Sequence, residues 1–154
     1  MFRSFRERRN AWRTRCHTAM CYCRLVPHPG YGWESVLQGI LPGTISSDLH
    51  QGNINGPVYD LATTMSKFLH LGVSLEEVIR RVTSNPARTF AFPTGTGSLK
   101  EGTTADVAVF ELRDAPWEMV DSMGESRPGR LRLRPMATVK AGRIYGNSVI
   151  PVYR

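Results

Sequence analysis

The sequence has no long hydrophobic run and little cysteine, and each absence excludes a class of protein. No apolar stretch approaches the roughly 18 residues of a membrane-spanning helix, and there is no apolar core of a secretory signal. The three cysteines lie close together near the start of the chain, and an odd count at one end is not a disulfide framework. The sequence therefore predicts a soluble, cytoplasmic protein in a reducing compartment, with no membrane partner.

Acidic residues are scarce at the start of the chain. Residues 1–35 hold seven arginines and only two glutamates, a net charge of +5, whereas the remainder holds thirteen basic and eleven acidic groups. Such a start can be an organellar targeting peptide, but Glu7 and the cysteines fit that interpretation poorly. A disordered basic tail is one alternative, and nucleic-acid binding through phosphate contacts and stacking on Phe5 and Trp12 is another. The arginines concerned are Arg3, Arg6, Arg8, Arg9, Arg13 and Arg15.

The same segment contains soft metal ligands in and after "CHTAMCYC". Their spacing lacks the C-X₂-C pair that structural zinc sites normally use, so a zinc site here is only an alternative to plain exposure. The residues in question are Cys16, His17, Cys21, Cys23 and His28.

The length of the chain limits which folds it can form. A chain of 154 residues can build one domain, and a domain of that size buries roughly 70% of its unfolded surface. An intact (β/α)₈ barrel needs about 250 residues, with about 200 as a practical minimum. The chain can therefore form a core, but it cannot hold a whole barrel of that kind.

Strand patterns enclose a helical region. Residues 33–43 are typical of a helix end, and residues 44–48, "TISSD", of a short buried strand. Further on the period becomes two, with a strand around 107–112, alternating apolar and arginine residues in 129–135, and two strands joined around Ala141–Gly142. The order strand, helices, strands predicts an α/β chain in which a βα unit precedes a small β layer.

The first expected helix occupies residues 58–72 and ends at Gly72. The pattern places Ser66 and Lys67 on its solvated face. His70 is expected in its tail, at the surface or partly packed. The apolar positions that recur at helical spacing are Leu61, Met65, Phe68 and Leu69.

Two shorter helices are expected after it. Ser74 and Glu77 form a capping box at the start of residues 74–85. Asn85 and Pro86 then provide an N-cap and a first-turn proline for another helix. The apolar face of the first of these two helices consists of Leu75, Val78, Ile79 and Val82.

Several of these motifs agree in order and spacing with one known family. The chain contains "PGTISSDLHQGNINGPVYDLATTMSKFLHLGVSLEEVIRRVTSNPA", then "GSLKEGTTADVAVFEL" and "VKAGRIYG". Over residues 36–146 it closely resembles the C-terminal part of the amidohydrolase superfamily, in the branch of dihydroorotase-like amidohydrolase/deacetylase metallohydrolases. Each motif alone is a weak signal, whereas their combination is specific.

The resemblance implies a distorted (β/α)₈ barrel with a metal centre of one or two zinc ions, and a β-sandwich built from both chain ends. It places Asp48 at the end of the eighth strand, as a metal ligand that accepts the proton of the attacking water. A strand end is a rigid mount for such a group, and barrel active sites lie at the C-terminal ends of strands. Zinc lowers the pKa of its bound water to about 7, which makes this chemistry accessible at neutral pH.

Other family elements are missing before Asp48. The family has a His-X-His pair on the first strand, a bridging Lys or Glu on the fourth, and a His on each of the fifth and sixth. Catalytic zinc usually has three protein ligands, which one carboxylate cannot replace. We therefore expect an incomplete fragment that is inactive alone. We also expect residues 1–33 to come from an altered reading frame or a misplaced start, which an upstream in-frame His-X-His in the encoding DNA would support.

The site residues have simpler interpretations as well. Asp48 could be a helix or turn cap after a strand. His50 could be a solvated loop imidazole, with a substrate or supporting role as the alternative. Asn53 and Gly56 are expected at the rim of a substrate pocket, with an ordinary turn cluster as the alternative. Asp106 is expected to be a structural residue at a strand entry.

The hypothesis has three parts along the chain. Residues 1–33 are a basic segment outside the family, residues 34–93 the end of an amidohydrolase barrel, and residues 94–154 strands of the β-sandwich. The expected activity of the complete enzyme is metal-dependent hydrolysis of a non-peptide C–N bond in a small amide, of the deacetylase or cyclic-amidase type. Nucleic acid is not expected as a partner of this site, and a homo-oligomer stays open. Whether the chain folds alone also stays open, because an unclosed barrel leaves strand edges and apolar helix faces uncovered.

Overall fold

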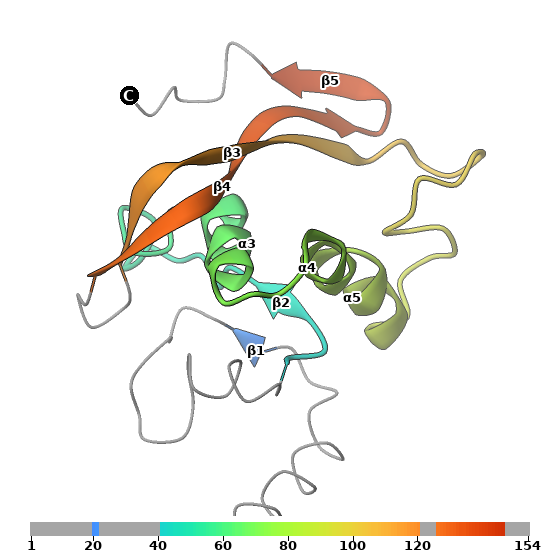
Figure 1. The fold of residues 1–154 in the computed structure, drawn as a ribbon. Coiled ribbons are helices and arrows are strands. Elements are labelled where there is room, and N and C mark those ends of the chain that lie inside the picture. Colours follow the sequence, from blue (N-terminus) through green and yellow to red (C-terminus); the bar gives the residue numbers. More distant parts are fainter. Residues whose placement is uncertain (1–19, 22–40, 121–125, 147–154) are drawn as a thin grey trace, which may run out of the picture.

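The computed structural model describes residues 20–21, 41–120 and 126–146. Within them, a three-stranded antiparallel sheet in the order β3-β4-β5 lies across helix α3, with α4 and α5 beside it (Figure 1). The elements are β1 (Met20–Cys21), β2 (Ile45–Ser46), α3 (Leu61–His70), α4 (Leu75–Val82), α5 (Ser84–Thr89), β3 (Val107–Val120), β4 (Ser126–Lys140) and β5 (Arg143–Gly146). The helix end predicted before residue 41 lies outside the described residues.

Strand β2 pairs in parallel with β1, so that Met20 lies opposite Ile45. The strand predicted in residues 44–48 is confirmed in a shorter form, with Thr44 and Ile45 buried. No periodicity in residues 1–33 indicates β1. The proposed boundaries after residues 33 and 93 stay predictions.

Helix α3 is the centre of the described core. The Asp60 side chain caps it by accepting a hydrogen bond from the Thr63 N–H at 2.6 Å, and Gly72 follows with a φ of 85°. Met65 and Phe68, predicted from the helical period, are 2% and 0% exposed. Their burial in one cluster with Met119 and Leu133 of the sheet stabilises the fold.

The prediction of a solvated face at Ser66 and Lys67 is wrong, because both residues are buried. The Ser66 hydroxyl donates to the Ala62 carbonyl at 2.7 Å and accepts from the Leu133 N–H of β4 at 2.9 Å. Lys67 Nζ donates to the carbonyls of Pro57 and Val120, at 2.9 and 2.8 Å. These polar groups tolerate burial because the sheet and a neighbouring loop provide their partners.

Helix α4 begins as its capping pattern predicts, with the Ser74 hydroxyl accepting from the Glu77 N–H at 3.3 Å. Its apolar face is only partly used. Val78 is buried, whereas Leu75 and Ile79 remain exposed. The predicted apolar face is therefore only partly buried.

The sheet confirms the strand patterns of the C-terminal third. β3 and β4 pair with Leu112 opposite Leu133, and β3 extends well beyond the predicted 107–112. β4 and β5 form a hairpin whose turn residues, Ala141 and Gly142, have φ values of 48° and 78°. Two consecutive positive φ values match the twist that a two-residue hairpin turn requires.

Asp106 holds this hairpin turn to the start of β3. Its carboxylate accepts hydrogen bonds from Lys140 Nζ and from the Ala141 N–H, the latter at 2.8 Å. The hydrogen bond from Lys140 and then that from Ala141 lower the pKa of Asp106 below its ordinary value. This agrees with the structural role expected for Asp106.

A lowered pKa makes the Asp106 contacts pH-dependent. The charged form is the one that the fold favours, so its stabilisation is present above the unfolded pKa of about 4 and is lost as pH falls through the lower folded pKa. We expect the difference in urea midpoint between the wild-type chain and Asp106→Asn to be constant above about pH 4 and to shrink below it. Parallel loss of stability in both proteins would contradict this role.

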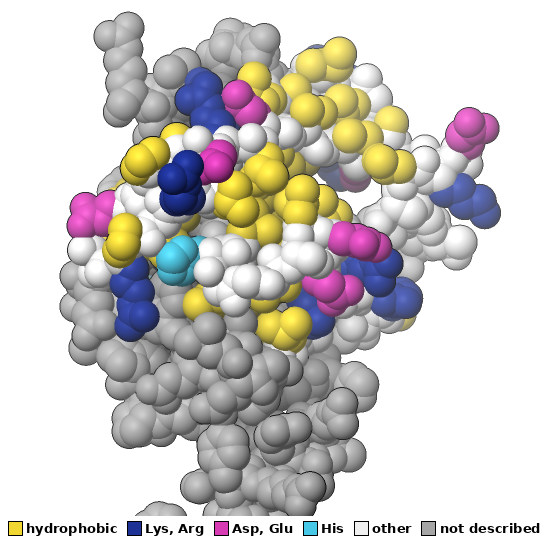
Figure 2. Space-filling model, in the orientation of Figure 1, with side chains coloured by type: hydrophobic (Ala, Val, Ile, Leu, Met, Phe, Trp, Pro, Cys, Tyr) yellow, Lys and Arg dark blue, Asp and Glu magenta, His cyan; other side chains and the backbone are white. Residues whose placement is uncertain are grey.

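Apolar side chains also remain on the surface. Figure 2 shows hydrophobic side chains where the helices meet the sheet and at the end of the sheet that carries β5. Leu112 and Ile144 are 45% and 77% exposed. No helix in the described ranges is both long and apolar enough to cross a bilayer.

Candidate functional site

The site expected from the sequence lies just after β2. Asp48 comes two residues beyond the end of this strand, is exposed, and has a φ of 47°. The buried Thr44 and Ile45 fix the strand in the interior, so the carboxylate is carried at the edge of the core. The loop that follows contains His50, Asn53 and Gly56, and thus brings the other candidate residues into the same segment.

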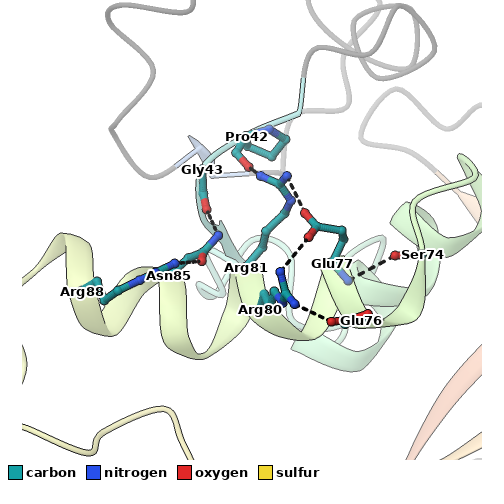
Figure 3. Close-up of polar contacts among 9 residues, drawn as sticks. All are labelled: Pro42, Gly43, Ser74, Glu76, Glu77, Arg80, Arg81, Asn85 and Arg88. Atoms are coloured by element: carbon teal, nitrogen blue, oxygen red, sulfur yellow. Dashed lines mark hydrogen bonds and ion pairs between the residues drawn. The ribbon is translucent and has the colours of Figure 1, made fainter.

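Helices α4 and α5 hold the chain immediately before β2 (Figure 3). Arg81 donates to the carbonyl of Pro42 and is itself held by Glu77 at 2.9 Å. Asn85 Nδ2 donates to the carbonyl of Gly43 at 2.9 Å. These contacts fix the direction in which β2 leads to the candidate site.

The predicted N-cap role of Asn85 is therefore wrong. Helix α5 starts at Ser84, and its N-cap residue Thr83 makes no side-chain capping bond. The Asn85 amide is used by the segment before β2 instead, while its Oδ1 accepts from Arg88 at 2.7 Å (Figure 3). A long-range contact of this kind has no local sequence signature.

Asn53 is the structural centre of the loop. It is 5% exposed, its Nδ2 donates to the Asp48 carbonyl at 2.9 Å, and its Oδ1 accepts from the His50 N–H at 2.8 Å. The expected contact of Asn53 with substrate stays a prediction. Sequence reasoning missed these backbone contacts, although an asparagine inside a glycine-rich loop is a known signal for them.

His50 has a defined hydrogen-bonding state at one ring nitrogen. Its Nδ1 accepts from the Gly52 N–H at 3.0 Å. A nitrogen that accepts carries no proton, so the proton of neutral His50 lies on Nε2. His50 is exposed, and its Nε2–H can donate a hydrogen bond to a ligand near Asp48.

Gly56 and Pro57 end the loop. Gly56 has a φ of 129°, and an added Cβ would lie 2.9 Å from Tyr59 Oη. Only glycine fits both conditions without strain. Pro57 is tied to α3 through Lys67, so this end of the loop is anchored to the core. The expected place of Gly56 at the rim of a substrate pocket stays a prediction.

The metal-ligand set is incomplete in the described part of the chain. Within residues 20–21, 41–120 and 126–146, no three His, Cys, Asp or Glu side chains form a group that could hold a metal ion. Asp48 can provide one carboxylate, whereas catalytic zinc usually takes three protein ligands. The described residues therefore do not fit a bound zinc ion by themselves. Two alternatives from the sequence concern residues outside the described ranges. They are a structural zinc site that uses Cys16, His17, Cys23 and His28, and nucleic-acid binding by the N-terminal arginines.

Comparison with known proteins identifies the class to which this arrangement belongs. A model of the amidohydrolase family matches residues 33–144. The chain therefore belongs to the amidohydrolase family, whose members are hydrolases that act on C–N bonds. The family is typically metal-dependent.

Curated relatives show which members of the family this chain is similar to in sequence. A deacetylase from Agrobacterium fabrum is 42% identical over 118 residues, which are 76% of this chain and 29% of that protein. A deacetylase from Enterococcus faecalis is 39% identical over 111 residues, 71% of this chain and 30% of that protein. An imidazolonepropionase from Vibrio cholerae is 31% identical, over 71% of this chain and 26% of that protein. The chain spans only about 30% of the length of the deacetylases.

Solved structures show the same relation in three dimensions. A crystal structure of an adenine deaminase matches with a TM-score of 0.69 and 36% identity, covering 75% of this chain and 31% of that chain. A dihydroorotase structure matches with a TM-score of 0.67 and 37% identity, covering 74% of this chain and 30% of that chain. The expected resemblance to the family is thus confirmed in sequence and in fold.

Proposed function

We propose that this chain provides the Asp48 segment of a metal-dependent amidohydrolase that hydrolyses a non-peptide C–N bond in an N-acyl or cyclic amide. The observation that carries the proposal is the position of Asp48, two residues beyond a strand anchored by the buried Ile45 and at the start of a loop held by internal hydrogen bonds. The deacetylase relatives favour an acetylated small molecule as substrate. The dihydroorotase and imidazolonepropionase relatives support the cyclic alternative.

Asp48 is the proton carrier in this proposal. Its carboxylate accepts a proton from the attacking water and returns it to the leaving nitrogen, which is ordinary general acid–base catalysis. When bound, a zinc ion would activate that water, with Asp48 as one of its ligands. The other ligands must come from outside the described residues, so we expect the chain alone to bind zinc weakly and to be inactive.

His50 and Gly56 complete the proposed local site. The Nε2–H of His50 is free of the Gly52 contact and is proposed to donate a hydrogen bond to the substrate. Gly56 and Pro57 are proposed to form the rim of the substrate pocket at the opposite end of the loop. In this arrangement β2 corresponds to the last strand of the proposed barrel, and β3, β4 and β5 to strands of the β-sandwich.

A chimera tests the proposal. Residues 33–144 replace the aligned segment of the Agrobacterium fabrum deacetylase, and hydrolysis of N-acetyl amino acids and cyclic amides is measured with zinc and with a chelator. We expect hydrolysis of an amide by the zinc-loaded chimera, and none by the 154-residue chain alone. A folded, zinc-loaded chimera without activity, or one that cleaves only acetyl esters, would contradict the proposal.

A further inference from the structure

Asn53 is a buried amide inside an exposed loop. Within the stretch 46–57, all of which the structure describes, Asn53 is the one buried residue. Burial of a carboxamide is unfavourable unless its donor and acceptor are both used. The burial of the Asn53 side chain therefore depends on hydrogen-bond partners within the loop.

Those partners are the two peptide groups on either side of Leu49. Asn53 Nδ2 donates to the Asp48 carbonyl, and Asn53 Oδ1 accepts from the His50 N–H. The Asn53 main chain adds a hydrogen bond from its own N–H to the His50 carbonyl at 3.0 Å. One residue thus fixes the backbone of Asp48 and His50 together.

The backbone that it fixes is an uncommon one. The φ of 47° places Asp48 in the left-handed region, which L-residues other than glycine adopt at a cost. Asp tolerates this region better than most residues, but the conformation still needs support from its surroundings. The hydrogen bond from Asn53 to the Asp48 carbonyl provides it.

We propose that Asn53 is a positioning residue for Asp48: its side-chain amide holds Asp48 in the left-handed conformation and so sets where the carboxylate lies beyond β2. The importance of that position for catalysis rests on the proposed function. The conformational claim itself concerns only this loop, and it stands or falls without a metal or a substrate.

Nuclear magnetic resonance on the isotope-labelled full chain tests the claim. A left-handed residue brings its amide and α protons close, so Asp48 should show a strong intraresidue NOE. A scalar coupling across the hydrogen bond should also connect Asn53 Nδ2 with the carbonyl carbon of Asp48 in the wild-type chain. In Asn53→Ala we expect a several-fold loss of the Asp48 NOE, with the amide shifts of Val78 and Leu133 unchanged.

Two further variants separate the donor role of the Asn53 side chain from its acceptor role and provide a control. Asn53→Asp keeps an acceptor for the His50 N–H but loses the donor, so the His50 amide shift should persist while the Asp48 NOE weakens. Asn55→Ala, a change at an exposed neighbour, should leave both signals unchanged. A strong Asp48 NOE in Asn53→Ala would overturn the proposal. If that variant does not fold, absence of the coupling in the wild-type chain would overturn it, and neither result depends on whether Asp48 binds a metal.

Discussion

Replacement of Asp48 by asparagine in the zinc-loaded chimera is expected to reduce the rate of amide hydrolysis by about 10²- to 10⁴-fold, the range that positioned proton transfer contributes. Asparagine has nearly the same size and keeps the backbone carbonyl to which Asn53 donates. It cannot accept a proton at neutral pH. The loss should therefore appear in kcat, measured at saturating substrate and with zinc in excess.

Asp114→Asn is the matched control for this change. Asp114 is an exposed carboxylate on β3, paired with Arg130 at 2.8 Å. Because its loss removes the same charge from the sheet and not from the loop, hydrolysis should remain near that of the unsubstituted chimera. Equal activity of Asp48→Asn and Asp114→Asn would show that Asp48 does not carry the proton.

The largest effect on stability is expected for Phe68→Ala. Phe68 is 0% exposed and packs in the cluster that joins α3 to Met119 and Leu133 of the sheet. Truncation of a buried phenylalanine to alanine typically lowers the free energy of unfolding by about 3–5 kcal/mol, since apolar contacts are lost and a cavity remains. Urea unfolding of the full chain measures this change.

Phe90→Ala provides the comparison for the same truncation at the surface. Phe90 is 50% exposed and lies at the end of α5. Its replacement should change the free energy of unfolding by less than about 1 kcal/mol. Similar losses for the two variants would mean that α3 and the sheet do not form the principal core.

The elements that the sequence predicts correctly are those fixed by local interactions. Ser74 caps its helix, and the turn at Ala141–Gly142 fixes a hairpin, because each of these signals acts over a few residues. The helical period also identifies Met65 and Phe68 as core residues. In each case the physical cause and the sequence pattern lie in the same short segment.

The errors arise where distant segments meet. Ser66 and Lys67 look solvated on a helical wheel, yet the Leu133 N–H and the carbonyl of Val120 satisfy them in the interior. Asn85 looks like a cap, yet it binds the carbonyl of Gly43. A polar residue can be buried when a partner far along the chain satisfies it, and no local pattern encodes that partner.

The candidate site likewise has features that local sequence predicts and features that depend on the folded loop. Its position after β2 follows from a local strand and loop pattern together with the family motifs. The hydrogen bonds of Asn53 to Asp48 and His50 depend on how the loop folds on itself. The expectation of an incomplete ligand set rests on the absence of the family's histidine motifs before Asp48.

The most direct test of the proposed metal-ligand role of Asp48 is a crystal structure of the zinc-loaded chimera, with the metal located by its anomalous scattering. We expect a zinc ion about 2.0–2.2 Å from a carboxylate oxygen of Asp48, with its remaining protein ligands contributed by the deacetylase part. A fully ligated zinc ion elsewhere, with the Asp48 carboxylate turned into solvent and no contact to the metal, would contradict it.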